Sequence, residues 1–274
     1  MYMSYQIRTD SVPILPEGAA DIRVLHLSDL HLTPKRKVEI ADIKSCINFN
    51  PDLVIVTGDF LASASAVPTV IDALGALLDL PGLFVFGSND YNAPQFKNPF
   101  SYLRKDDGIR KLGKELPWQL LATELCARGW IDLNHQRTML TVKGTTIEAR
   151  GTDDAHVSRD KYGEVAGEPN PKADLAIGVT HAPYLRILEA MSEDQLDIIF
   201  AGHTHGGQVR LPLPGGSKAL TTNCDLPTWR ARGLTKVQNE PWLNVSAGMG
   251  TSPFARIRVA SPPEVSIITL EPAF

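Results

Sequence analysis

The sequence contains little cysteine. Its 274 residues include only Cys46, Cys126 and Cys224, which lie far apart without paired spacing. An odd number of distant cysteines excludes a disulfide framework and indicates free thiols in a reducing compartment. The chain also lacks an excess of positive charge, because 27 basic residues stand against 31 acidic ones and the formal net charge is −4. A nuclease needs a basic surface, so we do not expect nucleic acid as a partner.

Long hydrophobic runs are absent as well. No stretch is long and apolar enough for a transmembrane segment. The N-terminus has no charged start followed by an apolar stretch, which excludes a secretory signal of the usual kind. The expected location is therefore the cytoplasm, and peripheral contact with a membrane is compatible with it. The composition, with 43% hydrophobic and 21% charged residues, is that of an ordinary globular protein.

Short apolar runs that end in polar or glycine-rich residues are what the sequence has instead. Runs of this length, rich in Val, Ile, Leu and Phe, predict buried strands. They lie at 22–27, 53–56, 83–86, 174–179 and 198–200. Helical spacing at 37–49 and 66–80, between these runs, predicts an α/β layering with a largely buried sheet.

Further strand patterns follow in the second half of the chain. They comprise a hairpin around Lys143-Gly144 and runs at 242–245, 256–259 and 265–270. We therefore expect an α/β fold in which two packed sheets form a β-sandwich flanked by helices, in a single domain over residues 1–274. Two segments, 92–117 and 153–173, are rich in proline, glycine or charge and are long enough to serve as cover loops.

Side chains that bind metal ions follow the predicted strands directly. Asp29 and His31 come after the first strand at a spacing of two, which points both side chains to one side of an extended segment. Ligands gather beyond the carboxyl ends of strands in open α/β sheets, so we expect these side chains to meet. The candidate metal ligands are Asp29, His31, Asp59, Asn89, His181, His203 and His205.

This set holds two carboxylates, one amide oxygen and four imidazoles. Mixed oxygen and nitrogen donors without thiolate suit Mn, Fe or Zn rather than Ca or Mg. Seven ligands are too many for one tetrahedral ion, but they suit two divalent ions that share a carboxylate. Such a pair clamps a phosphate, lowers the pKa of a bridging water and stabilises developing negative charge.

Five short motifs resemble, in order, those of the calcineurin-like metallophosphoesterases. They are Ser28-Asp29-Leu30-His31, Thr57-Gly58-Asp59, Gly87-Ser88-Asn89-Asp90, Thr180-His181 and Gly202-His203-Thr204-His205-Gly206-Gly207-Gln208. The last is most similar to a bacterial branch that includes hydrolases of diacylglucosamine nucleotides. The resemblance implies a four-layer αββα fold and a two-metal phosphoesterase. It also implies a small phosphorylated substrate, such as a sugar nucleotide or a phospholipid head group.

The resemblance also assigns roles to the seven candidate ligands. It implies that Asp29, His31 and His205 hold the first ion. It implies that Asp59 bridges the two ions, and that the second ion is held by Asn89, His181 and His203. We expect Asp59, Asn89 and His203 to be catalytic residues as well as ligands.

The third motif departs from the family pattern. The family usually has Gly-Asn-His-Asp or Gly-Asn-His-Glu, with Asn as a ligand and His beside the leaving group. An ungapped match places Ser88 in the ligand slot and Asn89 in the histidine slot, whereas a shift by one residue restores Asn89 as the ligand. We favour Asn89 because an amide oxygen is the better neutral donor. The histidine is missing in either register.

The other histidines are expected to be structural or exposed. His26 lies within a predicted strand and should be a hydrogen-bonded core residue, and His135 and His156 should lie on the surface. An alternative for His156 is that it reaches the site from the turn after Gly151.

The leading functional hypothesis is hydrolysis of a phosphoester or phosphoanhydride by metal-activated hydroxide that attacks phosphorus in line. The alternative is a non-catalytic scaffold that uses the same fold to bind a protein. Retention of all seven candidate ligands argues against the scaffold, because it has no physical need for buried polar clusters.

Overall fold

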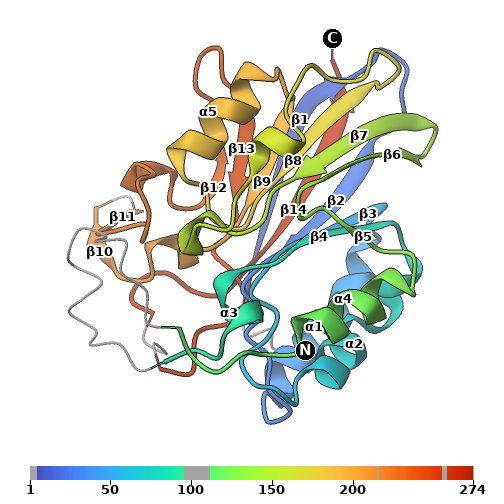
Figure 1. The fold of residues 1–274 in the computed structure, drawn as a ribbon. Coiled ribbons are helices and arrows are strands. Elements are labelled where there is room, and N and C mark those ends of the chain that lie inside the picture. Colours follow the sequence, from blue (N-terminus) through green and yellow to red (C-terminus); the bar gives the residue numbers. More distant parts are fainter. Residues whose placement is uncertain (1–4, 96–111, 215, 255–257, 274) are drawn as a thin grey trace.

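The structure is a computed structural model that describes residues 5–95, 112–214, 216–254 and 258–273. Two six-stranded sheets face each other, and helices cover the outer face of each (Figure 1). The predicted α/β sandwich with helices on both outer faces is therefore confirmed.

The first sheet contains the strands that precede the first three motifs. Its order is β1 (Gln6–Leu15), β14 (Glu264–Pro272), β2 (Ile22–Leu27), β3 (Leu53–Thr57), β4 (Gly82–Val85) and β5 (Ile131–Asp132). Strands β2 to β5 run parallel, β14 is antiparallel to β2, and β1 pairs with β14 in parallel. The outer face of this sheet is covered by α1 (Lys37–Ser45), α2 (Val67–Leu74) and α4 (Trp118–Cys126).

The second sheet contains the strands that precede the last two motifs. Its order is β12 (Gly233–Thr235), β13 (Trp242–Val245), β9 (Ile198–Ala201), β8 (Leu175–Val179), β7 (Thr145–Gly151) and β6 (Gln136–Val142). Strands β7, β8, β9 and β13 run parallel, and the predicted hairpin joins β6 to β7. Helix α5 (Leu185–Glu193) covers its outer face.

Each central strand is apolar on both faces, which explains its continuous hydrophobic run. In β2, Ile22 and Val24 belong to the core between the sheets, whereas Leu25 and Leu27 belong to the core under the helices. The two sets alternate because successive side chains of a strand point to opposite faces. Burial on both faces is typical of parallel sheets between layers, and it fixes the ends of these strands in space.

Most of the expected elements are present. The predicted helices are α1 and α2, each extended by a 3₁₀ turn, at Cys46–Phe49 and Gly75–Asp79. Of the segment 92–117, residues 96–111 lie outside the described residues. Segment 153–173 is irregular apart from short 3₁₀ turns. Of the strand expected at 256–259, only Arg258 and Val259 are described, and Val259 forms an isolated bridge to Val209.

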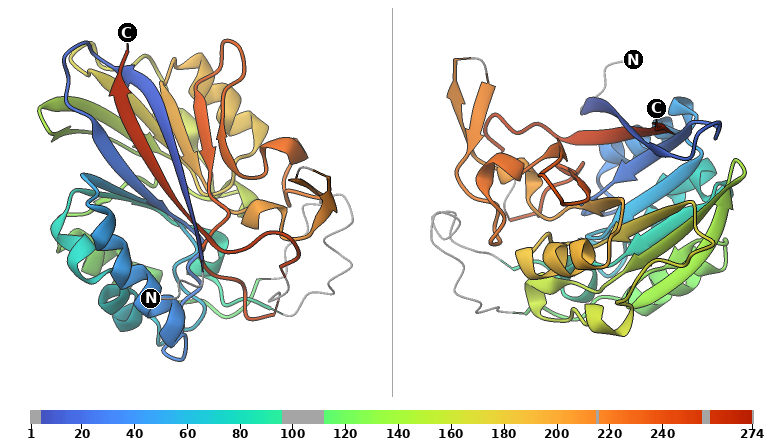
Figure 2. Two further views of the ribbon diagram at one scale, coloured as in Figure 1. Left: turned by 180° about the vertical axis from the view of Figure 1, so that it is seen from behind. Right: turned by 90° about the horizontal axis from the view of Figure 1, so that it is seen from above.

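A small antiparallel ribbon of β10 (Arg210–Leu213) and β11 (Gly216–Ala219) stands apart from both sheets. Figure 2 shows it projecting from the body of the molecule. No helix within the described ranges combines the length and the apolar character needed to cross a membrane.

Candidate metal centre

The structure brings all seven predicted ligands to one edge of the sandwich. Asp29 and His31 follow β2, Asp59 follows β3, and Asn89 lies in the short helix α3 (Ser88–Tyr91) after β4. From the other sheet, His181 follows β8, and His203 and His205 follow β9. Parallel strands end at the same edge, so two sheets deliver their loops to one place.

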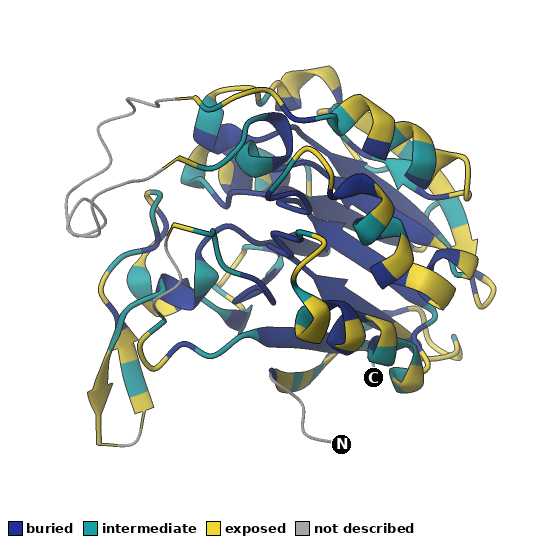
Figure 3. Ribbon diagram, turned by 90° about the horizontal axis from the view of Figure 1, so that it is seen from below, coloured by how far each residue is buried: buried dark blue, intermediate teal, exposed yellow. Residues whose placement is uncertain are grey.

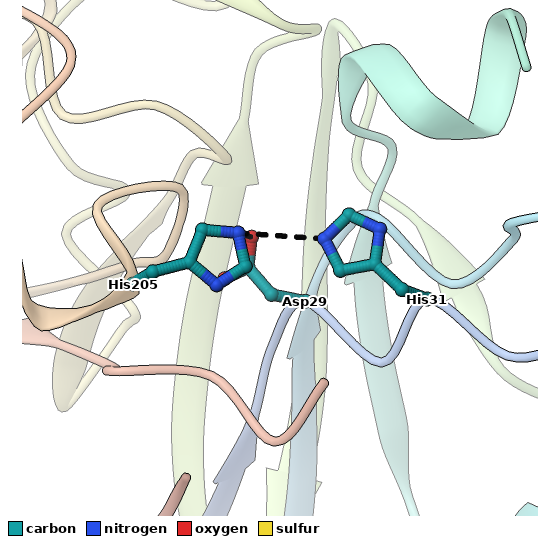
Figure 4. Close-up of side chains that lie close together, drawn as sticks. All are labelled: Asp29, His31 and His205. Carbon is teal, nitrogen blue, oxygen red and sulfur yellow. Dashed lines mark hydrogen bonds and ion pairs between the residues drawn. The ribbon is translucent and has the colours of Figure 1, made fainter. Parts of the chain in front are cut away.

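The first group of ligands consists of Asp29, His31 and His205 (Figure 4). One ligand atom from each lies within 4.8 Å of the others. The Nε2 atoms of His31 and His205 are 3.4 Å apart, and Nε2 of His205 is 3.5 Å from Oδ1 of Asp29. Two imidazole nitrogens and a carboxylate oxygen therefore converge on one point, as a transition-metal site requires.

The second group consists of Asp29, Asp59 and His181, again with atoms within 4.8 Å of one another. The two groups share Asp29, whereas the family resemblance makes Asp59 the bridge. Asp59 nevertheless spans both groups, because Oδ2 lies 3.5 Å from Nε2 of His31 and Oδ1 lies 3.7 Å from Nε2 of His181. This span favours Asp59 as the shared ligand.

Hydrogen bonds to the backbone fix the orientation of two histidines. His181 donates from Nδ1 to the carbonyl of Thr57 at 2.6 Å, which leaves the lone pair on Nε2 facing Asp59. Nε2 of His203 lies 3.1 Å from the carbonyl oxygen of Asn223 and 3.3 Å from the side-chain amide nitrogen of the same residue, so Asn223 fixes the orientation of this ring. Such outer contacts select the tautomer and aim the ligand nitrogen.

Three buried atoms of the predicted ligands have no hydrogen-bond partner among the described residues. They are Nδ1 of His31 and two atoms close to other ligands, Oδ1 of Asp29 and Nε2 of His181. A buried polar atom without a partner costs free energy, and a buried carboxylate costs more. Divalent cations would satisfy Oδ1 of Asp29 and Nε2 of His181, so the residues present fit the metal ions that the donor set implies.

Electrostatics in the site also favour a cation. Burial raises the pKa of Asp29 to about 6, and the neighbouring Asp59 raises it further against the pull of His181. Burial lowers the pKa of His31 to about 4. Burial also opposes charge on His181, but the carboxylates of Asp59, Asp154 and Asp29 outweigh it and raise the pKa of His181 to about 9. In the absence of metal, a proton on His181 therefore supplies the positive charge that bound ions would replace.

The backbone of the ligand loops is strained. Five predicted ligands have positive φ angles: Asp29 (52°), His31 (44°), Asp59 (56°), His203 (69°) and His205 (48°). Positive φ is uncommon for residues other than glycine, and each such position costs about 1–3 kcal/mol. Strain of this kind persists at functional sites because the surrounding structure holds it in place.

Two glycines permit the close approach of the loops. A Cβ atom on Gly202 would collide with Oγ of Ser28, and one on Gly87 would collide with Oδ1 of Asp59. The space that these side chains would need is filled by the candidate ligands and the residues beside them. Glycine at both positions lets backbone approach the carboxylates directly.

The third motif places Asn89 against Asp59. The backbone N–H of Asn89 donates to Oδ1 of Asp59 at 2.8 Å, and its amide nitrogen donates to Oδ2 at 2.6 Å.

The next residue, Asp90, was not among the predicted site residues. It is fully buried and accepts backbone N–H groups of Gly87, Asp59 and Leu61, so it ties the second and third motif loops together. The sequence did contain a signal for Asp90, because it occupies the acidic fourth position of the third motif.

The expectation that His156 lies on the surface is wrong. Its side chain is buried, and its ring centroid is 4.3 Å from that of His203. Nδ1 of His156 is 3.2 Å from the hydroxyl of Tyr184. The chain turns inward after β7 because Asp154 accepts the N–H of His156 at 2.8 Å. The alternative interpretation, in which His156 reaches the site, is the correct one.

The remaining histidines lie away from the ligands. His26 is fully buried, contacts Oγ1 of Thr57 at 2.9 Å through Nε2 and accepts from the amide of Asn244 at 2.7 Å, so its structural role is confirmed. His135 is half-buried, and its Nε2 accepts the N–H of Lys161.

An open cavity of about 110 Å³ leads to the site. Its lining includes five of the predicted ligands, His31, Asp59, Asn89, His203 and His205, together with Ser88, His156 and the neutral polar side chains of Asn92, Gln208, Thr221 and Asn223. The cavity is open to solvent.

The strain can be measured by comparing His31→Gly with His31→Ala in the presence of chelator. We expect the glycine variant to unfold at higher urea, with a free energy of unfolding about 1 kcal/mol larger, because glycine adopts positive φ without penalty. His181 is a matched control, since it is buried and does not have a positive φ. There the alanine variant should be the more stable one. If the difference in free energy of unfolding between the glycine and alanine variants had the same sign at His31 and His181, the result would contradict backbone strain at His31.

Comparison with known proteins agrees with this geometry. Residues 22–207 match the calcineurin-like phosphoesterase family. The chain is 27% identical over 268 residues to the uncharacterized protein YpbG of Bacillus subtilis, which covers 96% of this chain and 87% of the relative. It is 27% identical over 206 residues to the phosphodiesterase YaeI of Escherichia coli, covering 73% of this chain and 66% of the relative.

A further relative has a named substrate. The chain is 25% identical over 282 residues to the UDP-2,3-diacylglucosamine pyrophosphatase LpxG of Chlamydia trachomatis, covering 90% of this chain and 83% of the relative. The family match spans more than half of the chain and includes the motifs that converge at the site. This protein belongs to the calcineurin-like phosphoesterase family and is a hydrolase of phosphoester bonds.

Proposed function

We propose that the chain hydrolyses a phosphodiester or pyrophosphate bond by in-line attack of water at phosphorus, assisted by two divalent transition-metal ions. The observation that carries this proposal is the pair of overlapping ligand groups, Asp29-His31-His205 and Asp29-Asp59-His181, at the base of one cavity. Asn89 and His203 border the second group and complete the proposed ligand set. Mn, Fe and Zn are the ions that suit these donors.

The ions, when bound, would activate the water and neutralise charge on the phosphate. The residues of the chain hold this arrangement still. Asp59 lies between the two groups and is oriented by two hydrogen bonds from Asn89. His203 is held by Asn223, and its backbone N–H donates to Asp29 at 3.0 Å, so it couples the two groups. Little rearrangement is then needed during the reaction, which is what electrostatic catalysis requires.

The relatives support the choice of bond. YaeI is named a phosphodiesterase and LpxG a pyrophosphatase, and both cover most of this chain. The cavity lining beyond the ligands is polar and uncharged at Asn92, Gln208, Thr221 and Asn223, which suits a substrate larger than free phosphate. A non-catalytic scaffold is disfavoured, because it would keep buried atoms without partners and strained loops to no purpose.

Metal content is the first test. Purified protein should contain up to two transition-metal ions per chain, as measured by plasma mass spectrometry, because the ligand set suits two. Chelation should abolish hydrolysis, and Mn, Fe or Zn should restore it. Protein that takes up no metal after reconstitution with all three would refute the proposal.

The bridging role of Asp59 is the second test. Asp59→Asn should lower turnover by at least about 10²-fold, because the neutral amide cannot stabilise charge between two ions. Asp72→Asn is a matched control, since Asp72 has an exposed side chain that pairs with Lys44 on the helical surface. Near-normal turnover with near-normal metal content in Asp59→Asn would show that another residue bridges.

The missing histidine of the third motif generates the third test. A general acid contributes about 10²–10⁴-fold when the leaving group is poor, and neither Ser88 nor Asn89 can supply a proton near neutral pH. We expect aryl phosphodiesters and pyrophosphate-linked nucleotides to react much faster than simple alkyl esters. Equal rates, with the chemical step limiting, would contradict this expectation.

His156 provides the control for that test, because it lines the same cavity. His156→Gln removes an imidazole that contacts His203 and Tyr184. We expect it to slow aryl and alkyl substrates by the same factor, as a positioning residue would. A loss confined to alkyl esters would identify His156 as the proton donor.

A further inference from the structure

The ribbon of β10 and β11 stands at the mouth of the metal cavity. Gly207 and Gln208 precede it, Thr221 follows it, and all three line the cavity. From this base the two strands project away from the sandwich (Figures 2 and 3). Most of the residues in β10 and β11 are exposed, and none of their side chains belongs to the cores of the sandwich.

One face of the ribbon carries three leucines and a single lysine. Leu211 pairs with Lys218 and Leu213 pairs with Gly216. Residues opposite each other share a face, and residues two apart along a strand do so as well, so Leu211, Leu213 and Lys218 point the same way. Leu220, whose N–H donates to the carbonyl of Val209, extends this face toward the base.

The leucines of this face are exposed to solvent. Leu211 is 50%, Leu213 is 52% and Leu220 is 40% exposed. Single exposed leucines are common, but three on one face of a two-stranded ribbon form a contiguous apolar surface. A ribbon of two strands is marginally stable in water on its own, so this face gains stability when something covers it.

The charge around the ribbon indicates an anionic partner. Residues 206–236 contain five basic residues, Arg210, Lys218, Arg230, Arg232 and Lys236, and one acidic residue, Asp225. Arg230 is buried and pairs with Glu240 at 2.9 Å, so the other four carry the excess charge. The whole chain has the opposite balance, with 27 basic and 31 acidic residues. Arg210 binds only neutral groups within the described residues, namely Ser217 and the carbonyl of Gly206, so its charge is not neutralised by a carboxylate there.

The backbone argues against a further β-strand as the occupant. Pro212 lies in β10 and Pro214 follows it, and proline has no N–H to donate to a neighbouring strand.

Trp229, in the 3₁₀ turn Thr228–Arg230 that packs beside β11, is 63% exposed. Exposed leucine, a neighbouring tryptophan and basic side chains are the combination that binds membrane interfaces.

We propose that the ribbon docks the protein on an anionic lipid bilayer, with Leu211 and Leu213 inserted at the interface and Lys218 among the head groups. The metal cavity at the base of the ribbon then faces the lipid head groups. This placement deepens the proposed function, because it would make phosphates of lipid-linked molecules the accessible substrates. The docking itself does not depend on hydrolysis.

Vesicle flotation tests the docking. The intact chain should float with vesicles of equal parts phosphatidylcholine and phosphatidylglycerol, and poorly with phosphatidylcholine alone. The double variant Leu211→Ser, Leu213→Ser should partition at least about tenfold more weakly, because the inserted apolar surface is lost. Leu120→Ser is the matched control, since Leu120 is also 50% exposed but lies on α4 over the first sheet, and it should bind like the wild type. Lys218→Glu should weaken binding to the anionic vesicles by about fivefold or more.

A soluble aryl phosphodiester separates docking from catalysis. The double variant should hydrolyse it at the wild-type rate, because neither leucine lines the cavity. Failure to hydrolyse by the wild type would refute the proposed function and leave the flotation result valid. Equal flotation of wild type and double variant would overturn the docking proposal. A second result would also overturn the docking proposal. It is a wild type that does not bind vesicles but forms a dimer in sedimentation velocity, with a double variant that stays monomeric, because a second copy would then cover this face.

Discussion

The site depends on two carboxylates that are buried together without enough protein charge to balance them. Asp29 and Asp59 are almost entirely removed from solvent and belong to one ligand group. Burial and the charge of Asp59 raise the pKa of Asp29 to about 6. The attraction of the carboxylates, led by Asp59, outweighs burial and raises the pKa of His181 to about 9. A fold that keeps such a pair needs compensating positive charge at this point, and divalent ions provide more of it than one protonated imidazole.

The two sheets provide the rigidity that holds this arrangement in place despite its free-energy cost. Strands β2, β3, β8 and β9 are buried on both faces, so the residues that follow them cannot relax far. Positive φ angles at Asp29, His31 and Asp59 turn the chain sharply at the strand ends. Asp90 then links the second and third loops through three backbone donors. Strain is therefore stored in short loops whose ends are held by the core, and the ligand atoms converge as a consequence.

The sequence was sufficient to predict the sandwich and the convergence of the seven candidate ligands at one edge, because each candidate follows a strand with a clear apolar run. The same rule would have located His156, which lies five residues beyond the end of β7. A surface position was favoured for His156, with the site as the alternative, because the segment before it has the pattern of a hairpin. Strand β7 is instead an interior strand paired with both β6 and β8. Strand β1 was missed because its pattern is half exposed, and its place depends on pairing with β14 at the other end of the chain. Such pairing across the whole chain leaves no local signal.

The register of the third motif shows how geometry and sequence alignment can separate. Gly87 and Asp90 match the ends of the family motif without a gap in the sequence, and Asp90 is held by three N–H donors. An ungapped alignment would make Ser88 the ligand, yet the amide of Asn89 lies 2.6 Å from the carboxylate of Asp59. The short helix α3 brings residue 89 over Asp59, and a half-turn of the amide about its last bond would present oxygen instead of nitrogen to a metal ion. We therefore propose that Asn89, one residue after the position an ungapped alignment gives, is the donor, and that the histidine slot of the family has no proton donor of its own in this chain.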